Sequence, residues 1–430
     1  MLDIKLFREN PAIIRKSEIK RGHGTKFLDA VIKCDNEWRK ALKKVEELKA
    51  KRNAVTKEIS QLKKQGKKAD SKIKSMKKVA TDIQKQDSKV KEVLLERDAA
   101  RMAVGNILEA EIPKGKDDSE NVPIKHVGKK PKFDFPHKDH IEIGEELDLF
   151  DFDMGAKVAG SRFVYFKNEA VLLDLAIQNY AISILVKHGF NMVWPPLMLN
   201  RAALAGGVNL SEFEDTIYKI ENEDLYLIAT SELPLVALKK DQVIPEEELP
   251  FRFGGISTCF RKELGAHGRD DKGTIRMHQF NKVEEVVYCK PKDSPKYFKE
   301  MQAVTEEMWK ELGIPFRVVV ICTGDIGNKQ ALQYDIEAWF PGQDNKKGLY
   351  REVTSCSNCK DYQAVTLNTK YLNKKTGEKE YVHMLNNTAI ATSRAIPAIL
   401  ENFQQKDGSI KIPKCLWKYT GFKTIKPKKK

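Results

Sequence analysis

The chain has 430 residues, 41% of them hydrophobic, so it can bury a real core but exceeds what one core usually holds, and we expect two domains or one large domain with an appendage. Its formal charge of +15 favours a polyanionic partner such as nucleic acid, and its odd number of cysteines, seven, argues against a disulfide framework and for a reducing compartment. No apolar run approaches the roughly 20 residues that cross a bilayer, and the start, MLDIKLFRENP, lacks the build of a secretory signal, so we expect a cytoplasmic protein without a membrane partner.

Residues 31–104 predict two helices that pair along a narrow stripe. Apolar or long side chains recur at alternating spacings of three and four, which is the heptad pattern of a coiled coil. The stripe consists of Val31, Cys34, Trp38, Ala41, Val45, Leu48, Arg52, Val55, Ile59 and Leu62, then of Ile73, Met76, Ala80, Ile83, Asp87, Val90, Leu94, Arg97, Arg101 and Val104. A short turn at Gln65-Gly66 separates the halves, so we expect an antiparallel coiled-coil hairpin within an N-terminal domain, residues 1–112.

Lysine greatly exceeds glutamate around the predicted tip, KKQGKKADSKIKSMKK. Single lysines on the outer face of a coiled coil are ordinary solvated residues. An excess of one sign on a projecting rod, however, suits phosphate contacts that position a nucleic acid without reading its sequence. We therefore predict that the hairpin is a nucleic-acid-binding arm.

Prolines and charged residues dominate residues 113–160, which we expect to be a linker and the entry to a second domain, 161–430. That domain begins with a predicted helix over 170–187, ended by Gly189. Extended runs follow at 190–194, 225–229, 251–260, 277–289, 316–322, 334–340 and 350–355, with helices at 294–312 and 389–405. Strands outnumber the crossover helices of a parallel sheet, which favours an α+β fold with a largely antiparallel sheet flanked by helices.

The stretch 260–280 places Arg261-x-Glu263 and Arg276-x-x-x-Phe280 on two predicted antiparallel strands. Alternation would put Arg261 and Glu263 on one sheet face. A forked guanidinium matches phosphate oxygens, a carboxylate accepts from an amine, and a phenyl ring offers a platform for a base. These residues therefore indicate a nucleotide site, although a charged hairpin with cross-strand ion pairs would use the same residues. GxGxxG and GxxxxGK[ST] signatures are absent from the sequence, which disfavours Rossmann and P-loop nucleotide sites.

The same residues resemble motif 2 of class II aminoacyl-tRNA synthetases, and GFNMVWPPLM, residues 189–198, resembles their motif 1. More narrowly, TSE (230–232), HGRD (267–270), HQFNKVE (278–284), EVTSCSN (352–358) and HMLN (383–386), behind a helical hairpin, are similar to seryl-tRNA synthetases. The resemblance covers nearly the whole chain. It departs before Arg394, where Asn387, Ala389 and Ser393 stand at positions that often hold glycine in the family.

The resemblance implies that serine and ATP form seryl-adenylate, and that the seryl group then passes to the 3′ end of tRNA(Ser), with tRNA(Sec) a further substrate to consider. Arg261 would bind the α-phosphate, Arg276 the terminal phosphates, and Phe280 and Arg394 the adenine, with Glu263 near the adenine amine. Arg261, Glu263 and Arg394 are the expected catalytic residues. The implied ATP contacts are Arg261, Lys262, Glu263, Arg276, Met277, His278, Gln279, Phe280, Glu352, Val353, Thr354, Ser355 and Arg394.

The implied serine contacts are Thr230, Ser231, Glu232, Arg261, Glu284, Asn386 and Thr388, and Glu352 and Ser355 would hold Mg²⁺. The resemblance also implies a homodimer through residues 189–198, in which the arm of one subunit presents tRNA to the other.

Each residue has a plainer interpretation. Thr230 or Ser231 suits a helix N-cap, Glu284 a solvent-facing strand position, and Asn386 and Arg394 a cap and a surface charge. The Cys356-x-x-Cys359 pair has no second ligand pair for zinc, so structural thiols are preferred. His267 and His278 are expected to support the loop and backbone, because nothing nearby completes an acid–base constellation.

Two rival functions stay open from the sequence. A catalytically inactive synthetase-like RNA-binding protein would use the arm alone, but Arg261, Arg276, Glu352 and Arg394 are all present. A relative that loads amino acids onto a carrier protein would lack the arm.

Overall fold

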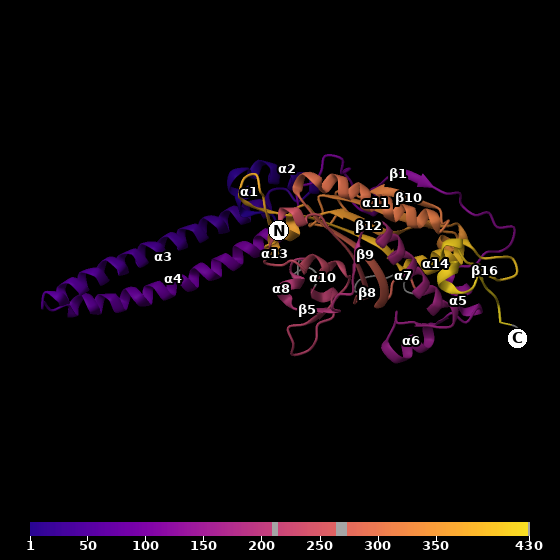
Figure 1. The fold of residues 1–430 in the computed structure, drawn as a ribbon, viewed down its shortest axis with the longest axis horizontal. Coiled ribbons are helices and arrows are strands. Elements are labelled where there is room, and N and C mark those ends of the chain that lie inside the picture. Colours follow the sequence, from indigo (N-terminus) through magenta and orange to yellow (C-terminus); the bar gives the residue numbers. More distant parts are fainter. Residues whose placement is uncertain (209–213, 264–272, 429–430) are drawn as a thin grey trace. The chain divides into compact units, whose positions relative to one another are not determined.

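The computed structural model describes residues 1–208, 214–263 and 273–428. The chain divides into two compact units, Met1–Ile107 and Leu108–Lys430, called here the N-terminal and C-terminal units. Figure 1 shows their elements. The segment expected to be a linker, 113–160, contains strand β1 (Val122–Val127), helices α5 (His140–Glu146) and α6 (Phe152–Ala159), and the short strand β2 (Phe150–Asp151).

The N-terminal unit is a helical hairpin with two short helices at its base. It comprises α1 (Ile4–Glu9), α2 (Pro11–Arg21), α3 (Lys26–Lys64) and α4 (Asp70–Met102). Helices α3 and α4 lie side by side over their length (Figure 1), and α3 with its 39 residues is about 58 Å long. The predicted antiparallel coiled coil is confirmed.

The predicted stripe is wrong at several positions: Arg52 of α3 is exposed, and in α4 Val93, which the prediction left out, is buried. Val79 is buried, whereas its neighbour Ala80, which the sequence pattern selected, is exposed. Either residue continues a three-four spacing from Met76, and the larger side chain takes the seam because it buries more apolar area.

Charged side chains fix the base and register of the hairpin. Asp35 on α3 pairs with Arg8 of α1 at 2.7 Å and with Arg97 of α4 at 3.4 Å, and all three groups are at least partly buried. Further along, Lys49 Nζ lies 3.0 Å from Asp87 Oδ1 across the two helices. A buried carboxylate shared by two arginines therefore holds the base of the hairpin. The exposed ion pair further along contributes little to stability.

In the C-terminal unit, eight of the described strands form one sheet, in the order β1-β10-β11-β12-β15-β9-β8-β4. Every pairing among them is antiparallel except that of β4 with β8. The strands are β10 (Phe316–Val320), β11 (Leu332–Phe340), β12 (Leu349–Asn358), β15 (His383–Ala391), β9 (Gln279–Cys289), β8 (Phe251–Phe260) and β4 (Asn191–Val193), with β1 given above. The predicted α+β fold with an antiparallel-dominated sheet is confirmed.

Three helices cover one face of this sheet. They are α7 (Glu169–Lys187), α11 (Ser294–Glu311) and α14 (Thr392–Asn402), and they share the main hydrophobic core with alternate residues of the central strands, such as Val283 and Val287 of β9. On the other face, Val286 and Tyr288 pack in a smaller core with α10 (Glu232–Ala237) and α13 (Tyr362–Leu367). The side chains of β9 thus alternate between a helix-covered core and a more open face.

Helix α7 is long and apolar enough to cross a membrane, contrary to the expectation that no run of the sequence approaches that length. Half of its most apolar window is buried within the protein, and Leu173, Ile177 and Leu185 belong to the main core. One side of α7 therefore belongs to the core, while Val171, Leu172, Leu175 and Val186 are exposed.

The helix predicted over 389–405 begins three residues later, at Thr392. Ala389, Ile390 and Ala391 belong to β15 instead, where Ile390 and Ala391 pair with Val283 and Lys282 of β9. Pairing with a central strand overrides the helix propensity of alanine.

The remaining elements are short. They are β3 (Tyr165–Phe166), β5 (Met198–Leu199), α8 (Arg201–Leu204), β6 (Tyr226–Leu227), β7 (Val243–Pro245), α12 (Gln343–Lys346), β13 (Lys370–Leu372), β14 (Lys379–Tyr381), β16 (Ile410–Lys411), α15 (Trp417–Thr420) and β17 (Thr424–Ile425), with 3₁₀ turns η1 (Asp118–Glu120), η2 (Glu214–Thr216), η3 (Glu246–Glu248), η4 (Pro291–Asp293) and η5 (Lys414–Leu416).

Glu285, on the helix-covered face of β9, predicts a pH-dependent loss of stability. Its Oε1 accepts from Thr305 Oγ1 at 2.9 Å, while its buried Oε2 has no partner. Burial raises its pKa from 4.5 to about 8. Between pH 4.5 and pH 8 the Glu285 carboxyl is therefore protonated in the folded state and ionised in the unfolded state. Its contribution to the free energy of unfolding is full below pH 4.5 and is lost as pH rises through 8.

We expect the difference in free energy of unfolding between Glu285→Gln and the wild type to move in favour of the variant by about 2–4 kcal/mol from pH 5 to pH 8. Urea unfolding at both pH values measures it. The exposed Glu221→Gln is the control and should show no such change. A flat difference for Glu285→Gln would show that Glu285 is ionised in the folded state.

Candidate active site

The open face of the sheet gathers polar side chains from two central strands. Phe280, Lys282 and Glu284 alternate along β9, and Glu284 is paired in register with Thr388 of β15. Asn386 is paired with Val286, two positions further along the same face. These residues come from stretches of sequence about 100 positions apart, and the sheet register brings them together.

A buried cluster centres on the Glu284 carboxylate. Its Oε1 accepts from Thr230 Oγ1 at 2.9 Å and from Thr388 Oγ1 at 3.3 Å. Lys282 forms an ion pair with the same oxygen and also donates to Thr388 Oγ1 at 3.1 Å. Glu284 is 2% exposed, so the interpretation of this residue as solvent-facing is wrong.

Glu232, the second carboxylate at this face, begins α10. Its Oε1 accepts from Gln363 Nε2 at 3.0 Å and pairs with Lys329. Its backbone N–H donates to Thr230 Oγ1 at 3.2 Å, so Thr230 serves both the start of the helix and the cluster around Glu284. Ser231 makes no side-chain cap hydrogen bond, and its Oγ donates to Gly255 O of β8 at 3.3 Å.

Two lysines of this site, Lys282 and Lys329, are missing from the residues predicted from the sequence. Burial, aided by the nearby charge of Arg261, lowers the pKa of Lys282 to about 8. Burial also acts to lower the pKa of Lys329, but the charge of Glu232 outweighs it and the pKa is raised. Each lysine therefore neutralises one carboxylate. Alternation along HQFNKVE placed Lys282 beside Glu284, whereas no local signal links Lys329 to Glu232.

The arginines lie at the end of the β8–β9 hairpin. Strand β8 ends at Phe260, so Arg261 and Glu263 lie beyond it, and the expectation that strand alternation places them on one face is wrong. The turn away from the strand is set by Glu263, which has a left-handed φ of 48°. The Arg261 guanidinium lies 5.2 Å from the centre of the Phe280 ring, and its Nε donates to Ala229 O at 3.3 Å.

Arg276 on the returning segment is exposed, and its Nη1 lies 3.8 Å from Glu263 Oε2. The base of the hairpin thus brings together all three charged residues predicted there. HGRD, which includes His267, lies outside the described residues.

His278 supports this turn. Its Nδ1 lies 2.7 Å from Arg261 O and 2.9 Å from the hydroxyl of Tyr218, and its ring stacks on Phe163 at 4.9 Å. Lys262 donates its backbone N–H to Thr216 O at 2.9 Å. Of the residues next to His278, Met277 is buried and Gln279 is exposed at the start of β9.

A β-bulge in β12 decides where the predicted metal ligands point. In the pairing with β11, Thr354 lies opposite Ile336 and Glu352 opposite Glu337, so Val353 is the extra residue. The bulge turns Glu352 to the face of Ser355, while Val353 and Thr354 are both buried. Without it, Glu352 and Ser355 would lie on opposite faces.

Oxygen atoms suited to Mg²⁺ therefore collect on this face of β11 and β12. Asp335, paired in register with Ser355, is buried, and burial together with the charge of Glu352 raises its pKa. Gln333 Nε2 donates to Ser355 Oγ at 3.0 Å. No group of three or more His, Cys, Asp or Glu side chains in the described part of the chain forms a ready-made metal site. The arrangement fits an ion that takes two protein oxygens and completes its shell with phosphates and water.

Helix α14 starts beside Phe280. Thr392 Oγ1 donates to Asn281 O of β9 at 3.1 Å, and Arg394 lies two residues further along, half-buried in the first turn. A cavity of about 500 Å³ has Phe280 and Thr392 in its wall. Both thiols of Cys356 and Cys359 are fully buried, and burial raises the pKa of Cys359 to about 12. Asn386 Nδ2 donates to Cys359 Sγ at 3.5 Å, which ties that thiol to the site wall.

Comparison with known proteins matches both units. A model described as the seryl-tRNA synthetase N-terminal domain matches residues 1–108, and one described as the tRNA synthetase class II core domain (G, H, P, S and T) matches residues 215–403. The serine–tRNA ligase of Pyrococcus horikoshii is 43% identical over 452 residues, covering 100% of this chain and 98% of its own. That of Methanocella arvoryzae is 45% identical over 422 residues, covering 97% and 98%.

Solved structures agree. The crystal structure of seryl-tRNA synthetase from Pyrococcus horikoshii complexed with ATP has a TM-score of 0.90 at 42% identity, with full coverage of both chains. The cytoplasmic serine–tRNA ligase from Naegleria fowleri in complex with AMP has a TM-score of 0.85 at 38% identity, covering 100% and 99%.

Proposed function

The chain belongs to the seryl-tRNA synthetase family, and from this premise we propose that it activates L-serine with ATP and transfers the seryl group to tRNA(Ser) in the cytoplasm. The observation that carries the proposal is the cluster of Thr230, Glu284 and Thr388 on the same sheet face as Phe280, whose ring lies under Arg261. A site for a small polar amino acid thus adjoins a site for a nucleotide.

The first step needs positioning more than proton transfer. The serine carboxylate is already a nucleophile at neutral pH, so its attack on the α-phosphate, which forms seryl-adenylate and releases pyrophosphate, requires no activating base. Arg261, held by Ala229 O and by its backbone bond to His278 O at 2.9 Å, would stabilise the charge that grows on the α-phosphate. Glu352 and Ser355 would hold Mg²⁺, which supplies further positive charge to the phosphates when bound. The seryl group then passes to the tRNA hydroxyl, and AMP leaves.

Selection of serine follows from the hydroxyl-rich cluster. Glu284 Oε1 already accepts from two threonine hydroxyls, and a serine hydroxyl would be a chemically matched addition or replacement. Alanine and glycine would make no such hydrogen bond, and wherever they displaced a hydroxyl partner they would leave a buried polar group unpaired, which is costly. Asn386, close by in register, and Glu232 offer further contacts for the substrate.

Serine-dependent exchange of ATP and pyrophosphate tests the proposal. We expect exchange with serine, and exchange rates with alanine and glycine that are lower by a factor of about 10³ or more, because a site built to bind a hydroxyl rejects analogues that lack it. Threonine is the comparison for size. Robust exchange with another amino acid and none with serine would overturn the substrate, and none with any amino acid would favour the inactive RNA-binding alternative.

For tRNA, we propose that the α3–α4 hairpin is the binding arm. Its distal part, residues 50–86, holds twelve Lys and Arg against three Asp and Glu, a net +9 of the chain's +15. Whether tRNA(Sec) is also charged depends on features of the RNA, and charging assays with both tRNAs would decide it.

We also propose a homodimer through the motif 1 region. Exposed apolar side chains gather on α7 and beyond β4: Val171, Leu172, Leu175, Val186, Trp194 and Met198, with Trp194 77% exposed. We expect light scattering to give twice 49.1 kDa, and Trp194→Asp to shift the protein towards monomer. Leu95→Asp, at an exposed leucine of the arm, is the control and should stay dimeric. A monomeric wild type would exclude the dimer.

A further inference from the structure

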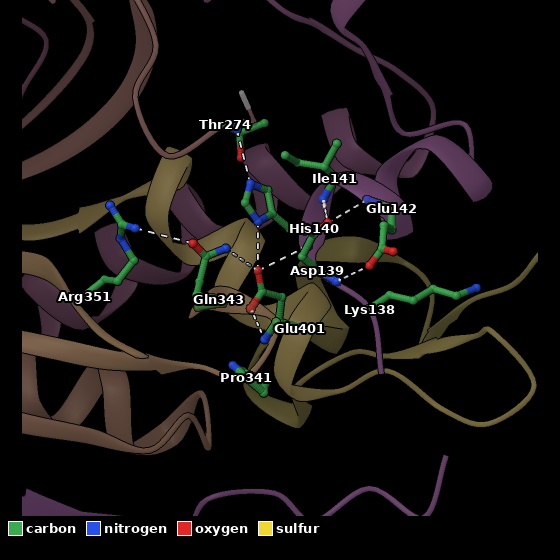
Figure 2. A network of polar contacts seen from close by, with 12 residues as sticks. Lys138, Asp139, His140, Ile141, Glu142, Thr274, Pro341, Gln343, Arg351 and Glu401 are labelled. Carbon is green, nitrogen blue, oxygen red and sulfur yellow. Dashed lines mark hydrogen bonds and ion pairs between the residues drawn. The ribbon is translucent and has the colours of Figure 1, made fainter. Parts of the chain in front are cut away.

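A buried histidine–glutamate pair lies outside the residues described so far. His140 opens α5 and Glu401 lies near the end of α14, and their side chains are 2% and 0% exposed. His140 Nδ1 donates to Glu401 Oε1 at 2.8 Å, and Nε2 accepts from the backbone N–H of Thr274 at 3.4 Å (Figure 2). The ring thus joins α14, which carries Arg394, to the segment two residues before Arg276.

The same carboxylate also holds the turn between β11 and β12. Glu401 Oε2 accepts from Gly342 N at 2.8 Å, and Oε1 accepts from Gln343 Nε2 at 3.2 Å (Figure 2). Arg351, next to Glu352 on β12, donates from Nη1 to Gln343 Oε1 at 3.4 Å. One carboxylate therefore contacts, directly or through one side chain, all three segments assigned to ATP.

The backbone packs so closely around this pair that two glycines near it have no room for a side chain. A Cβ on Gly273 would lie 2.4 Å from His140 Nε2, and Gly273 has a left-handed φ of 94°. A Cβ on Gly342 would lie 2.5 Å from Asp139 Cα. Asp139 caps α5 through a capping box with Glu142, which fixes the helix start that carries His140.

We propose that His140 and Glu401 are positioning residues for ATP, which set the segments bearing Arg276, Arg394 and Glu352 in register with one another. The inference rests on the proposed function, because it concerns the ATP site of the same enzyme. Its physical basis is that a buried carboxylate needs all of its donors, so the segments that supply them cannot move separately without stranding a buried charge. Phosphate clamps require such alignment, since a shift of about 1 Å can cost about 100-fold in rate.

The test compares three full-length variants by serine-dependent ATP–pyrophosphate exchange, with KM measured separately for ATP and serine. His140→Leu removes both hydrogen bonds at similar volume, and His140→Gln offers an amide that can accept from Thr274 and donate to Glu401. His137→Leu is the matched control, because His137 contacts the same turn through Pro341 O at 3.0 Å but has no bond to Thr274.

We expect His140→Leu to raise the KM for ATP about tenfold or more while the KM for serine changes less than about twofold, and His140→Gln to restore most of the loss. His137→Leu should leave both constants near wild type. An unchanged ATP KM in His140→Leu, or an equal rise in His137→Leu, would overturn the proposal.

Should His140→Leu not fold, Gly273→Ala decides, since its Cβ would meet the His140 ring and displace the segment that carries Thr274 and Arg276. A wild-type ATP KM in Gly273→Ala would likewise overturn the positioning role. Absence of exchange in the wild type would instead count against the proposed function, so the two failures are distinct.

Discussion

Arg261→Ala is expected to reduce serine-dependent ATP–pyrophosphate exchange by about 10²- to 10³-fold, because it removes a positioned charge from the transferring phosphoryl group. In the structure this guanidinium lies over Phe280 and is oriented by Ala229 O, so its place is set before substrate binds. Most of the loss should fall on kcat, since the charge it stabilises is greatest in the transition state. Arg261→Lys should recover little of the lost exchange activity, because an ammonium group cannot reproduce the two-pronged hydrogen bonding of a guanidinium.

Arg252→Ala is the matched control for this result. Arg252 lies on β8, the strand that precedes Arg261, and it also packs its guanidinium over an aromatic ring, Tyr297 at 5.1 Å, and pairs with Glu300 at 2.8 Å. It makes the same kind of contacts without belonging to the site, so exchange should stay within about twofold of wild type. Equal losses in the two variants would mean that Arg261 acts through stability, and the proposed chemistry would be withdrawn.

Local periodicity explains what could be predicted from the sequence. The arm repeats one pattern over two helices, so the pairing of these helices can be predicted from local spacing alone. The error at Ala80 arose because Val79 and Ala80 both fit that spacing. The main sheet was predictable as antiparallel because strands follow one another after short connections. The start of α14 was not, because the pairing of Ile390 with Val283 is a tertiary contact.

The site shows where sequence reasoning stops. The family resemblance named Glu352 and Ser355 together, yet regular alternation would separate them, and only the bulge at Val353 brings them to one face. Lys329 meets Glu232 from 97 positions away, so no spacing rule reaches it. The same holds for Glu401 and His140, which are 261 positions apart. These contacts come from the packing of separate elements, which a single sequence does not encode as a local pattern.

Shortening the arm should separate the two steps of the reaction. We expect deletion of residues 50–86, with a short glycine linker joining Lys49 to Asp87, to lower kcat/KM for tRNA about 100-fold or more at low salt. Exchange of ATP and pyrophosphate should stay within about twofold. Lys49 and Asp87 form an ion pair across the helices, so the cut closes at residues already in contact, and the Asp35 pairs with Arg8 and Arg97 keep the base folded.

The loss in charging should come from charge and not only from length. Replacing Lys63, Lys64, Lys67 and Lys68 with alanine should therefore weaken tRNA charging and reduce its dependence on salt, because fewer counterions are released on binding. Replacing Lys374 and Lys375, exposed lysines between β13 and β14, is the control and should leave charging near wild type.

A folded arm-deleted variant that loses exchange as severely as charging would show that the hairpin supports the catalytic unit. A variant that keeps both activities would show that tRNA binds elsewhere, since the removed segment carries most of the net charge available to hold an RNA backbone.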